Sequence, residues 1–208
     1  MFSLREMCQQ VAVIPVLVVK DTQHAKPLAE ALVAGGLTVL EVTLRTPAAL
    51  EVIRLMSEVP GSQVGAGTVL TLADVKAAKA AGAQFAVSPG ATADLVKAAA
   101  DEGLPLLPGA STASEVMRLL ELGLDTLKFF PAEAAGGVSM LKSLYGPLPK
   151  VMFCPTGGIT EKTASNYLVL PNVMCVGGSW VTPDNLLQAG DWQAIQALAQ
   201  VAQALKKV

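Results

Sequence analysis

Lys128 is the residue of this sequence whose type and surroundings most clearly point to chemistry. It is a single cation in the apolar run of residues 126–131, between Leu127 and Phe129. If this run is a parallel strand covered on both faces, the ammonium is buried, and an unpaired buried charge is costly. Desolvation then leaves part of the lysine population as the free amine, a nucleophile that can condense with a ketone. The alternative is that Lys128 reaches solvent from the strand end or pairs with a nearby carboxylate.

Glu41 and Arg45 belong to a second apolar run, residues 38–44, and to the loop that follows it. Alternate side chains of a strand share a face, so Glu41 is expected to point inward with Val39 and Thr43. It is interpreted either as an acid/base group or as the ion-pair partner of a core cation. The two interpretations are compatible if the cation is Lys128. Arg45 follows the strand, where its guanidinium could hold a substrate carboxylate through two hydrogen bonds. The alternative is a loop cation that faces solvent.

Glycine pairs follow the last two apolar runs. Residues 151–155 lead into Thr156-Gly157-Gly158, and residues 173–176 lead into Gly177-Gly178-Ser179. Glycine lets backbone N–H groups approach an anion and form a concave cradle, and barrels often bind phosphate at this place. The alternative is that both pairs serve tight turns only. Together, the candidate groups suit a substrate with a carboxylate at one end, a phosphate at the other and a ketone between them.

Three earlier runs also end in small or turn-forming residues. Residues 63–67 end in Gly65-Ala66-Gly67 and are followed by the hydroxyl of Thr68. The runs 84–88 and 104–108 end in Ser88-Pro89-Gly90 and Pro108-Gly109, and both ends are expected to form simple turns.

The elements that position these residues repeat one theme: an aliphatic run, a turn and an alanine-rich stretch. Eight runs are typical of strands: residues 11–19, 38–44, 63–67, 84–88, 104–108, 126–131, 151–155 and 173–176. A short lead-in helix is expected over residues 1–10, and eight further helices near 23–35, 47–58, 71–81, 92–102, 112–122, 138–145, 160–169 and 191–206. This alternation predicts an α/β fold, a (β/α)8 TIM barrel in one domain of residues 1–208. A doubly wound open sheet is the alternative, but no GxGxxG or Walker-type loop favours it.

Several helix ends are marked in the sequence. Thr46-Pro47 predicts an N-cap followed by proline at the first helical position. Thr112 with Glu115 has the spacing of a capping box, and Thr71 with Asp74 is a weaker analogue. Glycines stand where four helices are expected to end: Gly35-Gly36, Gly82, Gly103 and Gly123.

Composition excludes several classes of protein. With 52% apolar and 15% charged residues, extensive burial is expected and disorder is not. A net charge of −2 without a basic cluster leaves nothing for nucleic-acid binding. A single histidine counts against a zinc site, whereas Mg²⁺ held by carboxylates stays open. The nine-residue run 11–19 is too short to span a bilayer and has no cleavage site after it, so no membrane span or signal peptide is expected. Cys8, Cys154 and Cys175 are expected to be reduced and mostly buried, as in a cytoplasmic protein.

Six segments of the sequence resemble one known family. They are EVTLRTP (41–47), GAGTVL (65–70), VSPG (87–90), LKFFPAE (127–133), PTGGI (155–159) and GGSW (177–180). In this combination and order they are similar to bacterial 2-keto-3-deoxy-6-phosphogluconate (KDPG) aldolase/4-hydroxy-2-oxoglutarate (KHG) aldolases. The resemblance runs from about residue 4 to the C-terminus. It implies a class I aldolase that needs no metal or other cofactor, on a (β/α)8 barrel that is usually a homotrimer.

The resemblance also implies roles for particular residues. Lys128 corresponds to the Schiff-base lysine and Glu41 to the acid/base carboxylate. The substrate-binding residues would be Arg45 and Thr68 at the pyruvyl end, Pro89, Phe130 against the pyruvyl methyl, Thr156 near the centre that sets stereochemistry, and Gly157, Gly158, Gly178 and Ser179 at the phosphate. The implied reaction, a step of the Entner–Doudoroff pathway, cleaves the phosphorylated 2-keto acid to pyruvate and glyceraldehyde 3-phosphate, with 4-hydroxy-2-oxoglutarate as a second substrate.

Other functions fit parts of the pattern. A phosphate-binding barrel isomerase or epimerase could use Glu41 and Lys128 as a proton-transfer pair without a covalent intermediate. A barrel that only binds a phosphorylated ligand is disfavoured, because inward charges are expected at both positions. Sister aldolases for the phosphogalactonate substrate resemble this chain less, since they tend to lack a match to Arg45 and to Pro155-Thr156.

Overall fold

The computed structural model describes residues 3–206, in which strands and helices alternate along the chain. The elements are α1 (Leu4–Cys8), β1 (Val13–Leu17), η1 (Thr22–His24), α2 (Ala25–Ala34), β2 (Val39–Thr43), α3 (Ala49–Ser57), β3 (Gln63–Gly67), α4 (Leu72–Ala80), β4 (Phe85–Val87), α5 (Ala93–Asp101), β5 (Leu106–Leu107), β6 (Gly109–Ala110), α6 (Ala113–Glu121), β7 (Thr126–Phe129), α7 (Gly137–Tyr145), β8 (Met152–Pro155), α8 (Glu161–Leu168), β9 (Val176–Gly178), α9 (Asp184–Ala189) and α10 (Trp192–Gln203). Of the lead-in helix expected over residues 1–10, residues 4–8 are helical, and Met1 and Phe2 lie outside the described residues.

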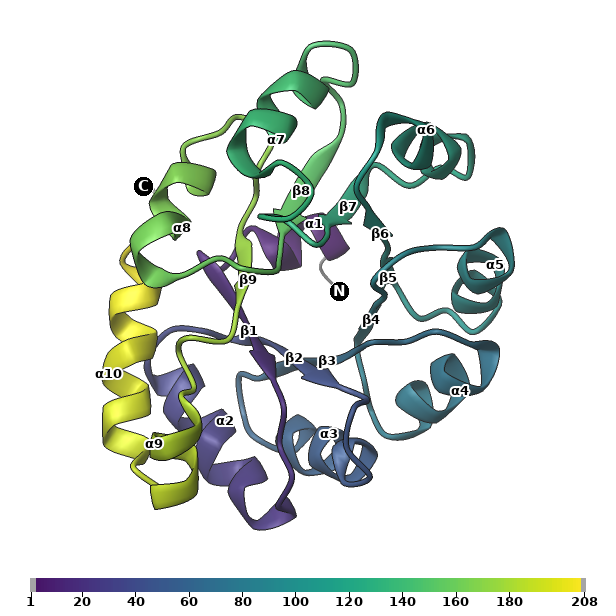
Figure 1. The fold of residues 1–208 in the computed structure, drawn as a ribbon. Helices are drawn as coiled ribbons and strands as arrows, with labels where there is room; N and C mark the ends of the chain where they lie inside the picture. Colours follow the sequence, from purple (N-terminus) through teal and green to yellow (C-terminus); the bar gives the residue numbers. More distant parts are fainter. Residues whose placement is uncertain (1–2, 207–208) are drawn as a thin grey trace.

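The strands form a curled parallel sheet with helices on its outer side, so the predicted α/β class is confirmed (Figure 1). Six strands pair in the order β5-β4-β3-β2-β1-β9, and three more pair in the order β6-β7-β8. Two isolated parallel bridges, Phe153 to Val173 and Thr156 to Gly177, connect β8 with the chain around β9. The carboxyl ends of parallel strands lie on the same side of the sheet, so the loops that follow them can share one site.

The fifth predicted strand, residues 104–108, is divided by Pro108. Leu106 and Leu107 form β5, which pairs with β4, while Gly109 and Ala110 form β6, which pairs with β7. Proline has no N–H to donate to a neighbouring strand, although its carbonyl still accepts from the Lys128 N–H at 2.9 Å. The expectation that Pro108-Gly109 is a simple turn was therefore wrong, because Gly109 belongs to a strand.

The last strand lies further along the chain than expected. The run 173–176 is rich in β-branched residues, but the observed strand is Val176–Gly178, paired with Val13 to Pro15 of β1. Pairing with a neighbour, and not local propensity, determines these bounds. Helix α9 was not predicted at all, although Pro183 before it and Gly190 after it are typical of helix boundaries.

Most of the predicted helix boundaries are confirmed. Thr71 with Asp74 and Thr112 with Glu115 form capping boxes, and Gly36, Gly82, Gly103 and Gly123 have positive φ just after helices. The cap predicted at Thr46 was wrong, because α3 begins at Ala49. The Thr46 hydroxyl donates to the Val19 carbonyl oxygen at 2.8 Å and so ties the loop after β2 to the loop after β1.

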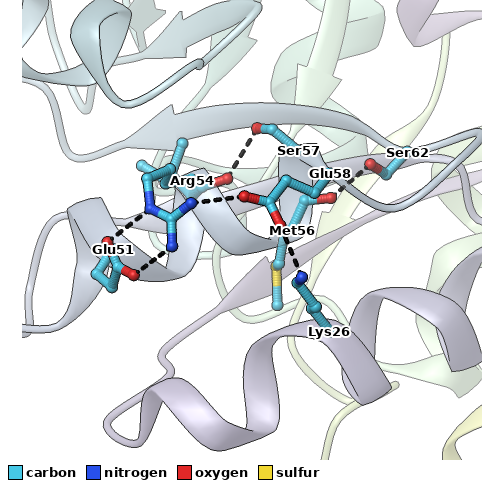
Figure 2. Close-up of polar contacts among 8 residues, drawn as sticks. Lys26, Glu51, Arg54, Met56, Ser57, Glu58 and Ser62 are labelled. Atoms are coloured by element: carbon cyan, nitrogen blue, oxygen red, sulfur yellow. Dashed lines mark hydrogen bonds and ion pairs between the residues drawn. The ribbon is translucent and has the colours of Figure 1, made fainter.

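Ion pairs on the outer surface join α2 to α3 (Figure 2). The Arg54 guanidinium lies between Glu51 and Glu58 at 2.7 and 2.5 Å, and Lys26 of α2 contacts Glu58 at 2.6 Å. Arg54 lowers the pKa of Glu51, and Lys26 is the main cause of a lowered pKa at Glu58. These four side chains are referred to below as the surface network.

The N-terminal helix α1 is attached to the start of β7. The Arg5 side chain donates to the Thr126 hydroxyl at 3.1 Å and to the Asp125 carbonyl oxygen at 3.1 Å, and it forms an ion pair with the Asp125 carboxylate at 2.9 Å. These contacts fix the beginning of the strand that contains Lys128. Over residues 3–206, no helix combines the length and the apolar character that crossing a membrane requires.

Candidate active site

Lys128 of β7 and Glu41 of β2 meet in the interior of the curled sheet. The Lys128 Nζ lies 3.3 Å from Glu41 Oε1, and the two side chains are only 7% and 4% exposed. The inward direction predicted for Glu41 and the burial predicted for Lys128 are confirmed, so the alternative in which Lys128 reaches solvent is wrong. The two remaining interpretations coincide, because the carboxylate that pairs with the buried lysine is the expected acid/base group.

Phe130 covers one side of this lysine. Its ring centroid lies 5.1 Å from Lys128 Nζ, a distance at which the face of the ring attracts a cation. Phe130 follows β7 and is joined to Pro131 by a cis peptide bond. The aromatic ring and the buried carboxylate together give the amine a largely water-free setting, in which electrostatic interactions are stronger than in water.

A missing side chain at position 67 makes room for the Glu41 carboxylate. A Cβ added to Gly67 would lie 2.4 Å from Glu41 Oε1 and 2.7 Å from its Cγ, far closer than atoms can pack. Thr68 follows with a φ of 61°, and it is the one non-glycine residue with positive φ between residues 3 and 206. Such a conformation is uncommon for a threonine and is typical of functional sites.

Arg45 lies at the carboxyl end of β2, as expected, and its side chain is exposed. Its Nε donates to the Thr43 hydroxyl at 3.2 Å, and that hydroxyl donates to the Leu17 carbonyl oxygen at 2.9 Å. This chain of hydrogen bonds connects the guanidinium to β1 and orients it, although β2 itself ends before Arg45.

Pro89 lies beside the strand that neighbours Lys128. A Cβ on Gly109 would be 2.1 Å from the Pro89 carbonyl oxygen, so only glycine allows the loop after β4 to come this close. Gly109 is paired in register with Lys128. The structure therefore brings Pro89 toward the lysine, although the two residues are far apart in the sequence.

The two glycine pairs lie next to each other at the ends of β8 and β9. The parallel bridge from Thr156 to Gly177 joins the two loops, and a Cβ on Gly177 would lie 2.2 Å from the Thr156 hydroxyl. Gly157 and Gly158 have φ values of 105° and 80°, a conformation that favours glycine. Both a tight turn and a backbone anion cradle use glycine in this conformation.

The second glycine pair, Gly177-Gly178, is more buried than the first pair, Gly157-Gly158. Gly178 is buried, and a Cβ there would lie 1.8 Å from the Trp180 ring, whereas Ser179 is exposed. Phe130 packs near the first pair, since a Cβ on Gly157 would be 3.3 Å from its ring. The structure thus brings together the buried Lys128, Glu41 and Thr156 with the partly buried Phe130, and the glycine loops lie beside them.

The three cysteines are free and buried, as predicted. Hydrogen bonding with Cys154 and Cys8, together with burial, raises the pKa of the Cys175 thiol well above its usual range. A protonated thiol is a poor nucleophile, so Cys175 adds no reactive group to the site. Between residues 3 and 206, no group of three histidine, cysteine, aspartate or glutamate side chains is arranged to hold a metal ion.

Comparison with known proteins shows one family along nearly the whole chain. The family described as "Aldolase: KDPG and KHG aldolase" matches residues 4–198. The sequence is 52% identical to a 2-dehydro-3-deoxy-phosphogluconate aldolase of Pseudoalteromonas atlantica, over 97% of this chain and 94% of that protein. It is 53% identical to the KHG/KDPG aldolase of Escherichia coli K12, over 91% and 90%.

The chain belongs to the KDPG and KHG aldolase family.

Solved structures of family members have the same fold. A KDPG aldolase of Zymomonas mobilis is 53% identical with a TM-score of 0.94, covering 100% of this chain and 99% of that one. A KDPG aldolase from Legionella pneumophila is 47% identical with a TM-score of 0.93, covering 96% and 97%, and it was solved with pyruvate captured as a covalent carbinolamine intermediate. A KDPGal structure is more distant, at 27% identity and a TM-score of 0.82, covering 94% and 95%. The resemblance inferred from the six motifs is thus confirmed.

Some residues of this aldolase site were not predicted. Gly67 and Gly109 leave room for other site residues, and their spacing in the sequence gives no sign of which residue each would contact. Gly177 belongs to the predicted glycine pairs, but its close approach to Thr156 was not predicted. Glu133 is also close to the site, where it accepts a hydrogen bond from Tyr167. Its place in the motif LKFFPAE was the available signal.

Proposed function

We propose that this aldolase cleaves 2-dehydro-3-deoxy-6-phosphogluconate to pyruvate and glyceraldehyde 3-phosphate through a Schiff base on Lys128. Cleavage of 4-hydroxy-2-oxoglutarate to pyruvate and glyoxylate is a second activity of the same site. The observation that carries the proposal is the buried Lys128 amine, 3.3 Å from the Glu41 carboxylate, in a member of this family. The names of its relatives support both substrates.

An ammonium is not a nucleophile, so Lys128 must lose a proton before the reaction begins. Glu41 is within hydrogen-bond distance of the Lys128 Nζ and is the group that can accept that proton, directly or through a water molecule. The neutral amine then attacks C2 of the 2-keto acid to give a carbinolamine. Glu41 gives its proton to the carbinolamine hydroxyl, which leaves as water, so that an iminium forms and the Glu41 carboxylate is regenerated. Arg45 holds the substrate carboxylate, which orients the carbonyl for attack.

The iminium accepts the electron pair of the C3–C4 bond as that bond breaks. Glu41 takes the proton of the C4 hydroxyl, so the aldehyde leaves as glyceraldehyde 3-phosphate and the enamine of pyruvate stays on Lys128. The enamine is protonated at C3, and water hydrolyses the resulting imine to pyruvate and free Lys128.

The remaining residues bind the two ends of the substrate. Thr68, Pro89 and Phe130 contact the pyruvyl part, and Thr156 lies near C4. Gly157, Gly158, Gly178 and Ser179 donate to the phosphate. The support for the phosphate loop is the bridge from Thr156 to Gly177, which joins the two glycine pairs, and the positive φ of the first pair. Because backbone N–H groups point outward in such a loop, they can surround an anion.

The proposed architecture is one closed (β/α)8 barrel, a single domain of residues 1–208, that forms a homotrimer in the cytoplasm. Closure is supported by the bridges between β8 and the chain around β9, and by the adjacency of β5 and β6 on either side of Pro108. The trimer rests on the family resemblance, and the cytoplasmic location rests on the free thiols.

Borohydride reduction in the presence of pyruvate tests the covalent step. Reduction converts an imine into a stable secondary amine, which peptide mass spectrometry is expected to locate on Lys128. A parallel reaction with Lys128→Arg, which keeps a cation of similar length, should leave the protein unlabelled. Aldolase turnover without any trapped adduct would overturn the Schiff base on Lys128, whereas isomerisation or epimerisation without cleavage or adduct would support a proton-transfer enzyme.

A further inference from the structure

Glu133 lies beside the proposed phosphate loop, although the proposed reaction does not use it. Its Oε1 accepts a hydrogen bond from the Tyr167 hydroxyl at 2.6 Å. Tyr167 belongs to α8, the helix that follows the Gly157-Gly158 loop, and its side chain is only 1% exposed. Glu133 belongs to the loop after β7 and is exposed. The hydrogen bond therefore joins the loop after the lysine strand to the helix after the phosphate loop.

Backbone hydrogen bonds join the same two loops directly. The Ala132 N–H donates to the Thr156 carbonyl oxygen at 2.8 Å, and the Glu133 N–H donates to that of Gly157 at 3.1 Å. Both carbonyls point toward the loop after β7. In a loop with this backbone conformation, the N–H groups of the following residues are left free to point elsewhere, which is what anion binding requires.

The stem of Glu133 lies against the second glycine of the loop. A Cβ on Gly158 would be 2.8 Å from the Glu133 Cβ and 2.7 Å from its Cγ. This contact limits where the backbone of Gly158 can lie, since the stem can move little while the carboxylate is bound to Tyr167.

Tyr167 determines the direction of the carboxylate. Burial, and then hydrogen bonding with Glu133, raises the pKa of Tyr167 well above its usual range, so the hydroxyl remains a donor at neutral pH. A buried hydroxyl without a partner is costly, and Glu133 provides the acceptor. A Cβ on Gly137 would lie 3.0 Å from the Tyr167 hydroxyl and 3.8 Å from Glu133 Oε2, so the carboxylate is held between α8 and the start of α7. The hydrogen bond from Tyr167 therefore keeps the negative charge of the Glu133 carboxylate on the side of the Gly157-Gly158 loop that faces α7 and α8.

We propose that Glu133 and Tyr167 form a positioning pair that holds the Gly157-Gly158 backbone in the geometry that receives the substrate phosphate. The pair thereby increases the preference of the enzyme for phosphorylated over unphosphorylated substrates. This inference rests on the proposed function and deepens it, because it assigns part of the substrate specificity to residues that do not touch the substrate.

The test compares two substrates that differ only in the phosphate: 2-dehydro-3-deoxy-6-phosphogluconate and 2-dehydro-3-deoxygluconate. Glu133→Ala and Tyr167→Phe are each expected to raise KM for the phosphorylated substrate about tenfold, the effect of losing one good hydrogen bond. KM for the unphosphorylated substrate and borohydride trapping of pyruvate on Lys128 should stay unchanged. Glu133→Gln keeps an oxygen acceptor for the tyrosine and should restore the wild-type ratio. The double variant should match either single variant, because both remove the same hydrogen bond.

Three outcomes would overturn the inference alone: equal losses on both substrates, an unchanged preference in Glu133→Ala and Tyr167→Phe, or additive effects in the double variant. Tyr167→Phe removes a single oxygen atom, so it provides the test even if a larger change disturbs folding, which circular dichroism checks. If the wild-type enzyme cleaves the unphosphorylated substrate but not the phosphorylated one, the proposed phosphate site fails and this inference fails with it.

Discussion

Two lysine–glutamate pairs in this protein have the same chemical groups in opposite surroundings. Lys26 and Glu58 of the surface network approach to 2.6 Å and are 48% and 44% exposed, whereas Lys128 and Glu41 are separated by 3.3 Å and are almost fully buried. The exposed pair has the shorter contact, but water and salt screen it, so it contributes little to folding. The buried pair has lost its hydration, and a hydrophobic pair of the same volume is often at least as stable.

The surroundings of the two pairs differ as much as their exposure. The side chains of the surface network in Figure 2 are each 44–49% exposed and so keep contact with water, and the contact between Lys26 and Glu58 joins α2 to the end of α3. A Cβ at Gly67 would collide with Glu41, the Phe130 ring covers Lys128, and Gly109, which is paired in register with Lys128, lets the backbone of Pro89 come close. So many restrictions around a pair that does little for stability are typical of a catalytic site.

The largest expected effect is that of removing the buried lysine. Lys128→Ala should reduce aldolase turnover to the background rate, because no other group at the site can form the imine. The fold should be retained, since β7 keeps its backbone pairing with β6 and β8, and circular dichroism checks this. Lys26→Ala is the matched control from the exposed pair and should leave the rate unchanged. Aldolase activity in Lys128→Ala would rule the amine out.

The next effect concerns the two glutamates. Glu41→Gln keeps the size of the side chain but cannot accept a proton, so kcat should fall by about 10²–10⁴-fold. Glu58→Gln makes the same change in the surface network and should leave kcat at the wild-type value. A near-normal rate in Glu41→Gln would assign a structural role to Glu41. The buried pair would then resemble the exposed Lys26–Glu58 pair in having no catalytic carboxylate.

A third prediction moves the buried carboxylate without changing it. Gly67→Ala adds a methyl group where Glu41 Oε1 now lies, so the carboxylate must shift and kcat should fall by about 10²-fold. Gly146→Ala is the control, because a Cβ there is 4.0 Å from its nearest neighbour and φ is −55°. If kcat is normal in Gly67→Ala, the exact position of Glu41 does not limit the reaction.

A charge added at the exposed edge of the site tests a position that is neither buried like Lys128 and Glu41 nor remote from the substrate like the surface network. Ser179→Asp places a carboxylate at an exposed position of the proposed phosphate loop. Repulsion between the two anions should raise KM for the phosphorylated substrate by about tenfold and should affect 4-hydroxy-2-oxoglutarate much less. Steady-state kinetics with both substrates measures the difference. Equal losses would remove the phosphate loop from the proposed site.

The smallest effect is expected in the surface network. The folded-state pKa values of Glu51 and Glu58 are lowered from 4.5, so the unfolded chain binds more protons just below that pH. The stabilisation from these groups is therefore present above pH 4.5 and is lost as the pH falls through the lower folded-state values. Arg54→Ala should reduce the acid-induced decrease in the thermal midpoint, at low salt but not at high salt. An identical decrease in wild type and variant would show that these ion pairs are without effect on stability.

Local patterns in the sequence were sufficient for much of this description. The alternation of apolar runs with helical stretches predicted the α/β class, and the period of a strand predicted that Glu41 points inward. Capping spacings at Thr71 and Thr112 predicted two helix starts correctly. These features depend on residues a few positions apart, whose relative directions the backbone dictates.

Contacts between distant segments were decided only by the tertiary structure. Lys128 and Glu41 are 87 positions apart, and their distance depends on how the sheet curls. Pairing with β1 shifted the last strand to Val176–Gly178, and Pro108 divided the fifth strand between two sets of neighbours. The contacts of Gly67 with Glu41 and of Glu133 with Tyr167 are of the same kind. A sequence pattern shows the direction of each side chain from its own strand or helix, but the partner it meets is determined by packing between elements.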